Sequence, residues 1–94
     1  MIFPNAELAA ARDGFLRAAA GYPFGKGRRS RDAATLVDAA LRLPDGDRLA
    51  LLRQALRVAR ATQSRTPGGA RRLDPDTAEA LGRLERMLAA VGEA

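Results

Sequence analysis

The residues of this chain that are best suited to chemistry form a basic segment from Gly25 to Arg31, with the sequence Gly-Lys-Gly-Arg-Arg-Ser-Arg. Glycines let a backbone approach a ligand closely, and the amides at a helix N-terminus favour anions. The spacing does not match a P-loop, and the ligand that we expect is the phosphate of a nucleic acid or an acidic partner. Tyr22 and Phe24 are available to stack on bases or to pack under this loop. The alternative is a solvated loop whose two aromatic side chains fill the end of the fold. The candidate contacts in this segment are Lys26, Arg28, Arg29 and Arg31.

A second set of cations recurs at helical spacing farther along the chain. Arg53, Arg57 and Arg60 are four and three residues apart, which places three guanidiniums on one face of a helix. This face is suited to a phosphate backbone, joined by Arg71 and Arg72. The alternative is the solvent-exposed face of an amphipathic helix. Apart from Gln54 and Gln63, no aromatic or amide-rich surface accompanies the stripe, so we expect little readout of bases.

The residue types that most enzymes need are missing. The sequence contains no histidine and no cysteine, which removes the commonest general base, the commonest metal ligand and any thiolate. Two pairs of aspartates remain, Asp45 with Asp47 and Asp74 with Asp76, and each lies where a helix N-terminus favours negative charge. We interpret these aspartates as helix caps. The sequence therefore predicts a non-enzymatic protein with no catalytic residue, no cofactor and no metal site.

Leucines near the C-terminus follow a heptad-like pattern. Leu81, Leu84, Leu88 and Val91 step by three, four and three residues, which is typical of a helix that packs along one seam. A small domain often completes its core across a two-fold axis, so these four residues are candidates for self-association in a homodimer. The alternative is that they close the core of a single chain.

The positions of apolar residues, prolines and glycines predict an all-α fold with four helices. The central pair is a helical hairpin, because apolar residues recur at helical spacing on both sides of a break at Leu43-Pro44-Asp45-Gly46-Asp47. We expect Leu52 and Leu56 of this hairpin to be buried against the preceding helix. The predicted helices cover residues 5–20, 31–43, 46–64 and 75–91 of one domain, 1–94.

Local signals predict how the helices begin and where they come close. Asn5 is the expected N-cap of the first helix, and Ser30 or Asp32 that of the second. Gly14 lies inside the first helix, where glycine is unfavourable. We therefore expect either a close neighbour or a bend at Gly14.

The composition of the chain also bears on its partners and on its location in the cell. The chain has 94 residues, a net charge of +5 and almost all of its basic charge on arginine. Such a charge attracts polyanions, although an alanine- and arginine-rich chain is also typical of a GC-rich bacterial genome. The sequence shows no signal peptide and no apolar run of membrane-spanning length. We expect a cytoplasmic protein with no membrane contact.

These features favour a non-enzymatic helical module for protein–protein interaction, such as a small regulatory, adaptor or assembly protein. Its expected partner is another protein or a second copy of the chain, and we expect no small-molecule substrate. The alternative is a nucleic-acid-binding protein that relies on arginine–phosphate contacts without strong base readout.

Overall fold

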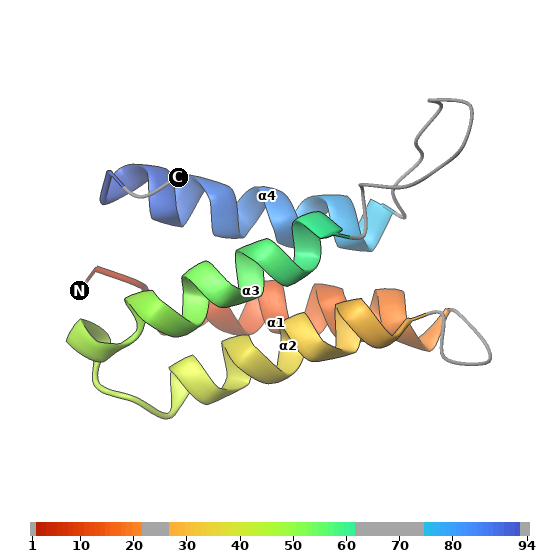
Figure 1. Ribbon diagram of the computed structural model, residues 1–94, viewed down its shortest axis with the longest axis horizontal. Helices are drawn as coiled ribbons and strands as arrows, with labels where there is room; N and C mark the ends of the chain where they lie inside the picture. Colours follow the sequence, from red (N-terminus) through yellow and green to blue (C-terminus); the bar gives the residue numbers. More distant parts are fainter. Residues whose placement is uncertain (1, 22–26, 62–74, 93–94) are drawn as a thin grey trace.

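The computed structural model describes residues 2–21, 27–61 and 75–92, and its α-helices run alternately up and down a bundle (Figure 1). The predicted all-α class, a small bundle of four helices around a central hairpin, is confirmed. The helices are α1 (Asn5–Ala20), α2 (Arg28–Leu41), α3 (Leu49–Ala61) and α4 (Pro75–Ala90), with a 3-10 turn η1 (Asp45–Asp47) between α2 and α3.

Each helix packs on two others. The α1 helix lies between α2 and α4, and α3 packs on α2 and, less extensively, on α4. The start of α1, the η1 turn and the end of α4 lie at one end of the bundle, which we call the η1 end (Figure 1). The end of α3 and the start of α2 lie at the other end, which we call the basic end.

The N-cap of α1 and the start of α2 differ from the prediction, although α1 covers the predicted residues 5–20. Pro4 is the N-cap of α1 and Gly27 that of α2, and neither makes a side-chain capping hydrogen bond. The α2 helix begins three residues before the predicted residue 31, so Ser30 lies in its first turn and is buried. Asn5 and Ser30 are therefore helical residues rather than caps, and Asp32 lies farther inside α2. Local capping signals miss this because tertiary packing extends the helix.

Two glycines allow close contacts between helices. A Cβ at Gly27 would lie 2.7 Å from both the Cα and the carbonyl oxygen of Ala19, so α2 can start here only without a side chain. A Cβ at Gly14 would lie 3.1 Å from the Cβ of Ala80 and 3.3 Å from the carbonyl oxygen of Asp76. Of the two expectations for Gly14, the structure shows the close neighbour, which is α4.

The core is built from a few large side chains among many alanines. Leu52 and Leu56 are buried, as expected from the hairpin pattern, and Phe3 and Phe15 are buried with them. The alanines keep the helix axes close, and the large side chains fill the remaining space. The fully buried large side chains are Phe3, Leu8, Phe15, Val37, Leu52, Leu81, Leu84 and Leu88.

A buried arginine joins the helices at the η1 end. Arg48 is 5% exposed, and its Nε donates to the carbonyl oxygens of Ala40 at 2.9 Å and Leu43 at 3.1 Å. Its Nη2 donates to Leu41 at 3.2 Å, and its Nη1 donates to Phe3 at 2.9 Å. Arg48 thus satisfies carbonyls at the C-terminus of α2 and ties them to the segment before α1.

Asp45 completes this connection, in a role that differs from the predicted one. Its carboxylate accepts hydrogen bonds from the amides of Ile2 at 2.6 Å and Phe3 at 2.9 Å, and lies 3.5 Å from Arg48 Nη1. These two backbone hydrogen bonds, helped by the charge of Arg48, lower the pKa of Asp45. The η1 turn has no side-chain cap, so Asp45 holds the start of the chain rather than its own helix.

Candidate functional site

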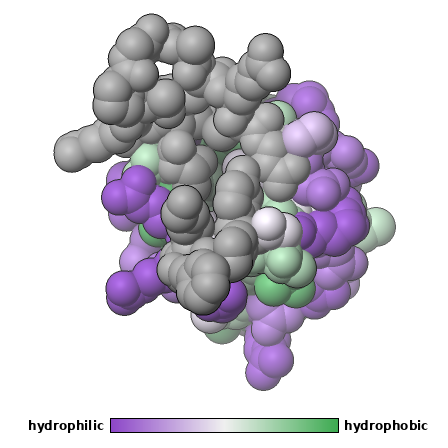
Figure 2. Space-filling view, turned by 90° about the vertical axis from the view of Figure 1, so that its right-hand side faces the viewer, coloured by the Kyte–Doolittle hydropathy of each residue, from purple (hydrophilic) through white to green (hydrophobic). Residues whose placement is uncertain are grey.

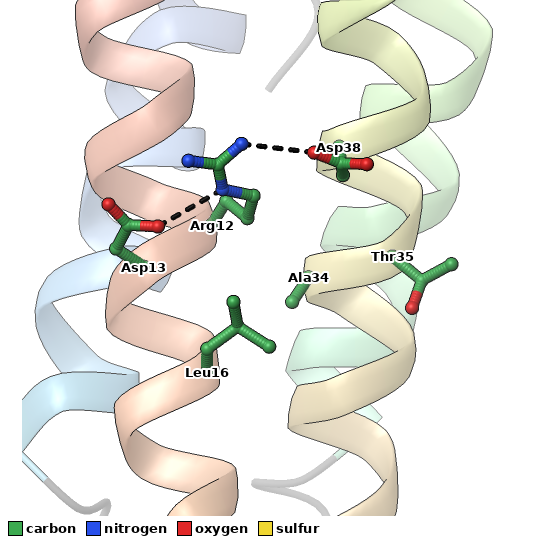
Figure 3. Close-up of a pocket in the computed structure, with 6 residues that line it drawn as sticks. All are labelled: Arg12, Asp13, Leu16, Ala34, Thr35 and Asp38. Atoms are coloured by element: carbon green, nitrogen blue, oxygen red, sulfur yellow. Dashed lines mark hydrogen bonds and ion pairs between the residues drawn. The ribbon is translucent and has the colours of Figure 1, made fainter.

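The structure contains a groove between α1 and α2 that the sequence analysis did not predict. The groove has a volume of about 420 Å³. It opens to solvent on the outer side of the two helices, with Leu16 and Ala34 directed toward each other across it (Figure 3). Its lining residues are Arg12, Asp13, Leu16, Ala34, Thr35 and Asp38.

The groove arises from a contrast in side-chain size. Ala34 is buried and forms the base, because its methyl group leaves space that a larger residue would fill. Leu16 is 46% exposed although it is a large apolar residue. It lies outside the buried stripe of α1, which includes Leu8, Ala11 and Phe15. The groove therefore combines an apolar wall with a small-residue base, an arrangement suited to binding an apolar side chain.

Ion pairs close one side of the groove. Arg12 Nη1 lies 3.0 Å from Asp38 on α2, and Arg12 Nε lies 3.0 Å from its neighbour Asp13 (Figure 3). Hydrogen bonds to Asp13 and then Asp38 raise the pKa of Arg12. Asp38 also pairs with Arg42 at 3.1 Å, as the i,i+4 spacing predicts. This cluster spans α1 and α2 and holds polar groups of both signs beside the apolar wall.

The predicted basic segment lies largely within α2. Arg28, Arg29 and Arg31 are exposed in the first turns of this helix, and Lys26 lies outside the described residues. Arg28 Nε is 4.0 Å from Asp32, which is a long and solvent-exposed pair. Arg29 Nη1 donates to the carbonyl oxygen of Ala61 at 2.7 Å. Figure 2 faces this end of the bundle, and most of the surface that is coloured in it is hydrophilic.

The predicted arginine stripe lies on the outer face of α3. Arg53, Arg57 and Arg60 are all exposed. Arg60 Nη2 lies 3.3 Å from Glu85 Oε2 on α4. The contact between Arg29 and Ala61 brings this stripe together with the basic start of α2. Arg71 and Arg72, which we expected to extend the stripe, lie outside the described residues.

The leucines that we expected on a self-association surface lie in the core of one chain. Leu81, Leu84 and Leu88 are buried, and only Val91, at 36% exposure, reaches solvent. Heptad-like spacing indicates that one face of a helix is covered, and in this bundle α1 and α3 cover that face of α4. The burial thus fits the alternative that was left open, in which these side chains close the bundle.

The carboxylates that could suggest catalysis have other partners. Asp45 binds backbone amides, and Asp76 lies 3.2 Å from Arg17. Asp74 lies outside the described residues. Within the part of the chain that the structure describes, no three acidic side chains are grouped so as to hold a metal ion, and no helix is long and apolar enough to cross a membrane.

Comparisons with known proteins give no family or relative for this chain. No protein-family model matches it, and no curated protein or solved structure is significantly similar to it. The function must therefore be argued from the surfaces described above.

Proposed function

We propose that this protein is a non-enzymatic helical interaction module that binds an amphipathic helix of a partner protein in the groove between α1 and α2. The observation that carries the proposal is Leu16, a large apolar side chain that is 46% exposed at the wall of a groove of about 420 Å³. Exposed apolar residues are common as isolated cases, but one beside a concave surface is typical of a binding site.

A helix is the partner element that best fits this shape. An amphipathic helix presents apolar side chains at i, i+3, i+4 and i+7, and it docks by placing them in an apolar groove. One such side chain would pack against Leu16 and Ala34. Polar residues on the flank of the same helix would face Arg12 and Asp38, which already carry charges of both signs. The groove thus supplies an apolar anchor point with a polar rim, as protein interfaces do.

The carboxylates of the groove support a binding role over a catalytic one. Asp13 and Asp38 both accept hydrogen bonds from Arg12, and the sequence has no histidine or cysteine to act beside them. Both carboxylates are thus engaged by a guanidinium within the protein, so these two residues are better suited to orienting a partner.

The test is selection of helical peptides against the full chain, followed by titration of the enriched peptides in fluorescence anisotropy. We expect Leu16→Lys to weaken their binding at least tenfold, or about 1.4 kcal/mol, because it removes the apolar anchor. Leu43→Lys is the matched control, since Leu43 is 37% exposed but does not line the groove. Peptides that bind wild type and Leu16→Lys equally well would contradict the proposal.

A further inference from the structure

Basic charge is unevenly distributed over the helices. The α3 helix contains three arginines and no carboxylate, whereas α1 has two arginines and two acidic residues. The arginines of α1 also have partners: Arg12 pairs with Asp13 and Asp38, and Arg17 pairs with Asp76. Among the four α-helices, α3 therefore carries the largest net positive charge.

Two arginines of this face, Arg57 and Arg60, are held only weakly by the described part of the fold. Arg57 is exposed and has no ion pair or side-chain hydrogen bond in the part of the chain that the structure describes. Arg60 pairs only with Glu85, at 3.3 Å and with both side chains nearly half exposed, and such surface pairs are weak. The guanidiniums of Arg57 and Arg60 are therefore available to a ligand at little cost to the fold.

We propose that the outer face of α3, with Arg29 at its C-terminal end, binds the phosphate backbone of a nucleic-acid duplex. Arg29 joins this face because its guanidinium contacts the carbonyl oxygen of Ala61 at the end of α3. From residue 53 to residue 60 the helix rises about 10 Å. A DNA duplex carries about six phosphate charges over that length of its axis, so several guanidiniums can be matched at once.

The character of the surrounding surface favours a nucleic acid over an acidic protein. Protein interfaces have an apolar centre with large anchoring side chains. Among the described residues, the large apolar side chains that are well exposed are Ile2, Leu16, Leu43 and Val91, and none of them lies on α3. Interfaces with nucleic acid are more polar and more positive. The α3 face is likewise polar and positive, as an interface with nucleic acid is.

The mode of binding follows from the same residues. Single-stranded nucleic acid is held by bases that stack on exposed aromatic side chains, whereas the α3 helix contains no aromatic residue. Arginine contacts to phosphate fix position without reading sequence. The α3 face is thus suited to a duplex, with little preference among sequences. This surface is separate from the α1–α2 groove, so the inference does not depend on the proposed protein partner.

The test measures binding of the full chain to a DNA duplex and an RNA duplex of about 20 base pairs by fluorescence anisotropy, from about 50 to 200 mM salt. We expect Arg57→Gln to weaken binding about three- to tenfold and to reduce the slope of log affinity against log salt by about 1. The double change Arg29→Gln with Arg57→Gln should reduce the slope by about 2. Unrelated sequences should be affected equally, and circular dichroism should show that each variant is folded.

Arg86→Gln is the matched control, because it removes the same charge from an exposed site on α4, on a groove shared with Ile2 and Pro4. We expect it to change affinity by less than twofold. Equal losses for Arg57→Gln and Arg86→Gln would overturn the proposal, since net charge alone would then explain binding. Absence of binding to both duplexes at about 50 mM salt would also overturn it. Poly-glutamate that binds through Arg57, when neither duplex does, would assign the face to an acidic protein instead.

Discussion

The two ends of the bundle use arginine in opposite ways. At the η1 end, Arg48 is buried, and its guanidinium donates to backbone carbonyls from α2 and from the segment before α1. Toward the basic end, Arg31 and Arg57 are exposed, and within the described residues they make no side-chain hydrogen bond or ion pair. Arg29, also exposed, donates one hydrogen bond to the carbonyl oxygen of Ala61. The same side chain thus serves the fold at one end and remains available to a partner at the other.

This difference shows that the role of an arginine depends on where its donors are directed. A buried guanidinium must have its hydrogen bonds satisfied, because an unpaired polar group in the interior is costly. Arg48 meets this requirement with carbonyls that the end of α2 leaves without helical partners. An exposed guanidinium is solvated and has no such requirement. Stability measurements should therefore separate the two groups of arginines.

The largest effect is expected from Arg48→Met, which keeps an apolar stem but removes every donor. The carbonyls of Leu41, Leu43 and Phe3 would lose this donor, and the Ala40 carbonyl would keep only the amide of Leu43. The Asp45 carboxylate would also lose its nearby positive charge. We expect the free energy of unfolding to fall by about 3–5 kcal/mol, measured by urea denaturation at neutral pH. A loss below about 1 kcal/mol would show that the two ends do not differ as described.

A smaller, pH-dependent effect is expected from Asp45→Asn. The amides of Ile2 and Phe3 lower the pKa of Asp45 in the folded protein. The ionised carboxylate thus stabilises the fold above its ordinary pKa of about 4, and this contribution disappears as the pH falls through the lowered folded value. The wild type should lose more stability between pH 5 and pH 3 than Asp45→Asn does, measured by urea midpoints.

The matched control for this pH dependence is Asp47→Asn. Asp47 is exposed in the same turn, and its carboxylate makes no hydrogen bond or ion pair within the described part of the chain. Its pH profile should follow the wild type. If Asp45→Asn also follows the wild type, the hydrogen bonds to the start of the chain do not contribute to stability.

The smallest effect is expected from Arg57→Gln. Because this side chain is exposed and has no partner among residues 2–21, 27–61 and 75–92, its replacement should change the free energy of unfolding by no more than about 0.5 kcal/mol. The same urea titration used for Arg48→Met provides the comparison. A loss near that of Arg48→Met would mean that Arg57 has a structural role, which would remove the distinction between the two ends.

The helices and the central hairpin were predictable because they depend on local patterns. Apolar spacing identified the buried side of α3, including Leu52 and Leu56, and residues 5–20 match the bounds of α1. The start of α2 was not predictable in this way. It depends on the contact of Gly27 with Ala19, two residues on different helices, and no local rule reports such a contact.

The candidate sites also divide into those that local sequence patterns predict and those that they do not. Helical spacing correctly placed Arg53, Arg57 and Arg60 on one exposed face. The groove beside Leu16 was missed, although a large apolar residue outside the buried stripe of α1 was a signal that could have indicated it. Arg48 was missed because it lies among aspartates in a polar turn, where a solvated arginine is the usual expectation. Spacing alone also does not say whether Leu84 and Leu88 are covered by the same chain or by a second copy.

The close contact of Gly27 with Ala19 has a consequence for the kinetics of binding. Together with the ion pair between Arg12 and Asp38, it fastens α1 to α2 at two separate levels, so the distance between the two helices is set before any partner arrives. A site held in this way loses little conformational entropy when it is occupied. Association with α1 and α2 would then be a single step whose rate rises in proportion to partner concentration, limited by encounter rather than by a rearrangement of the bundle.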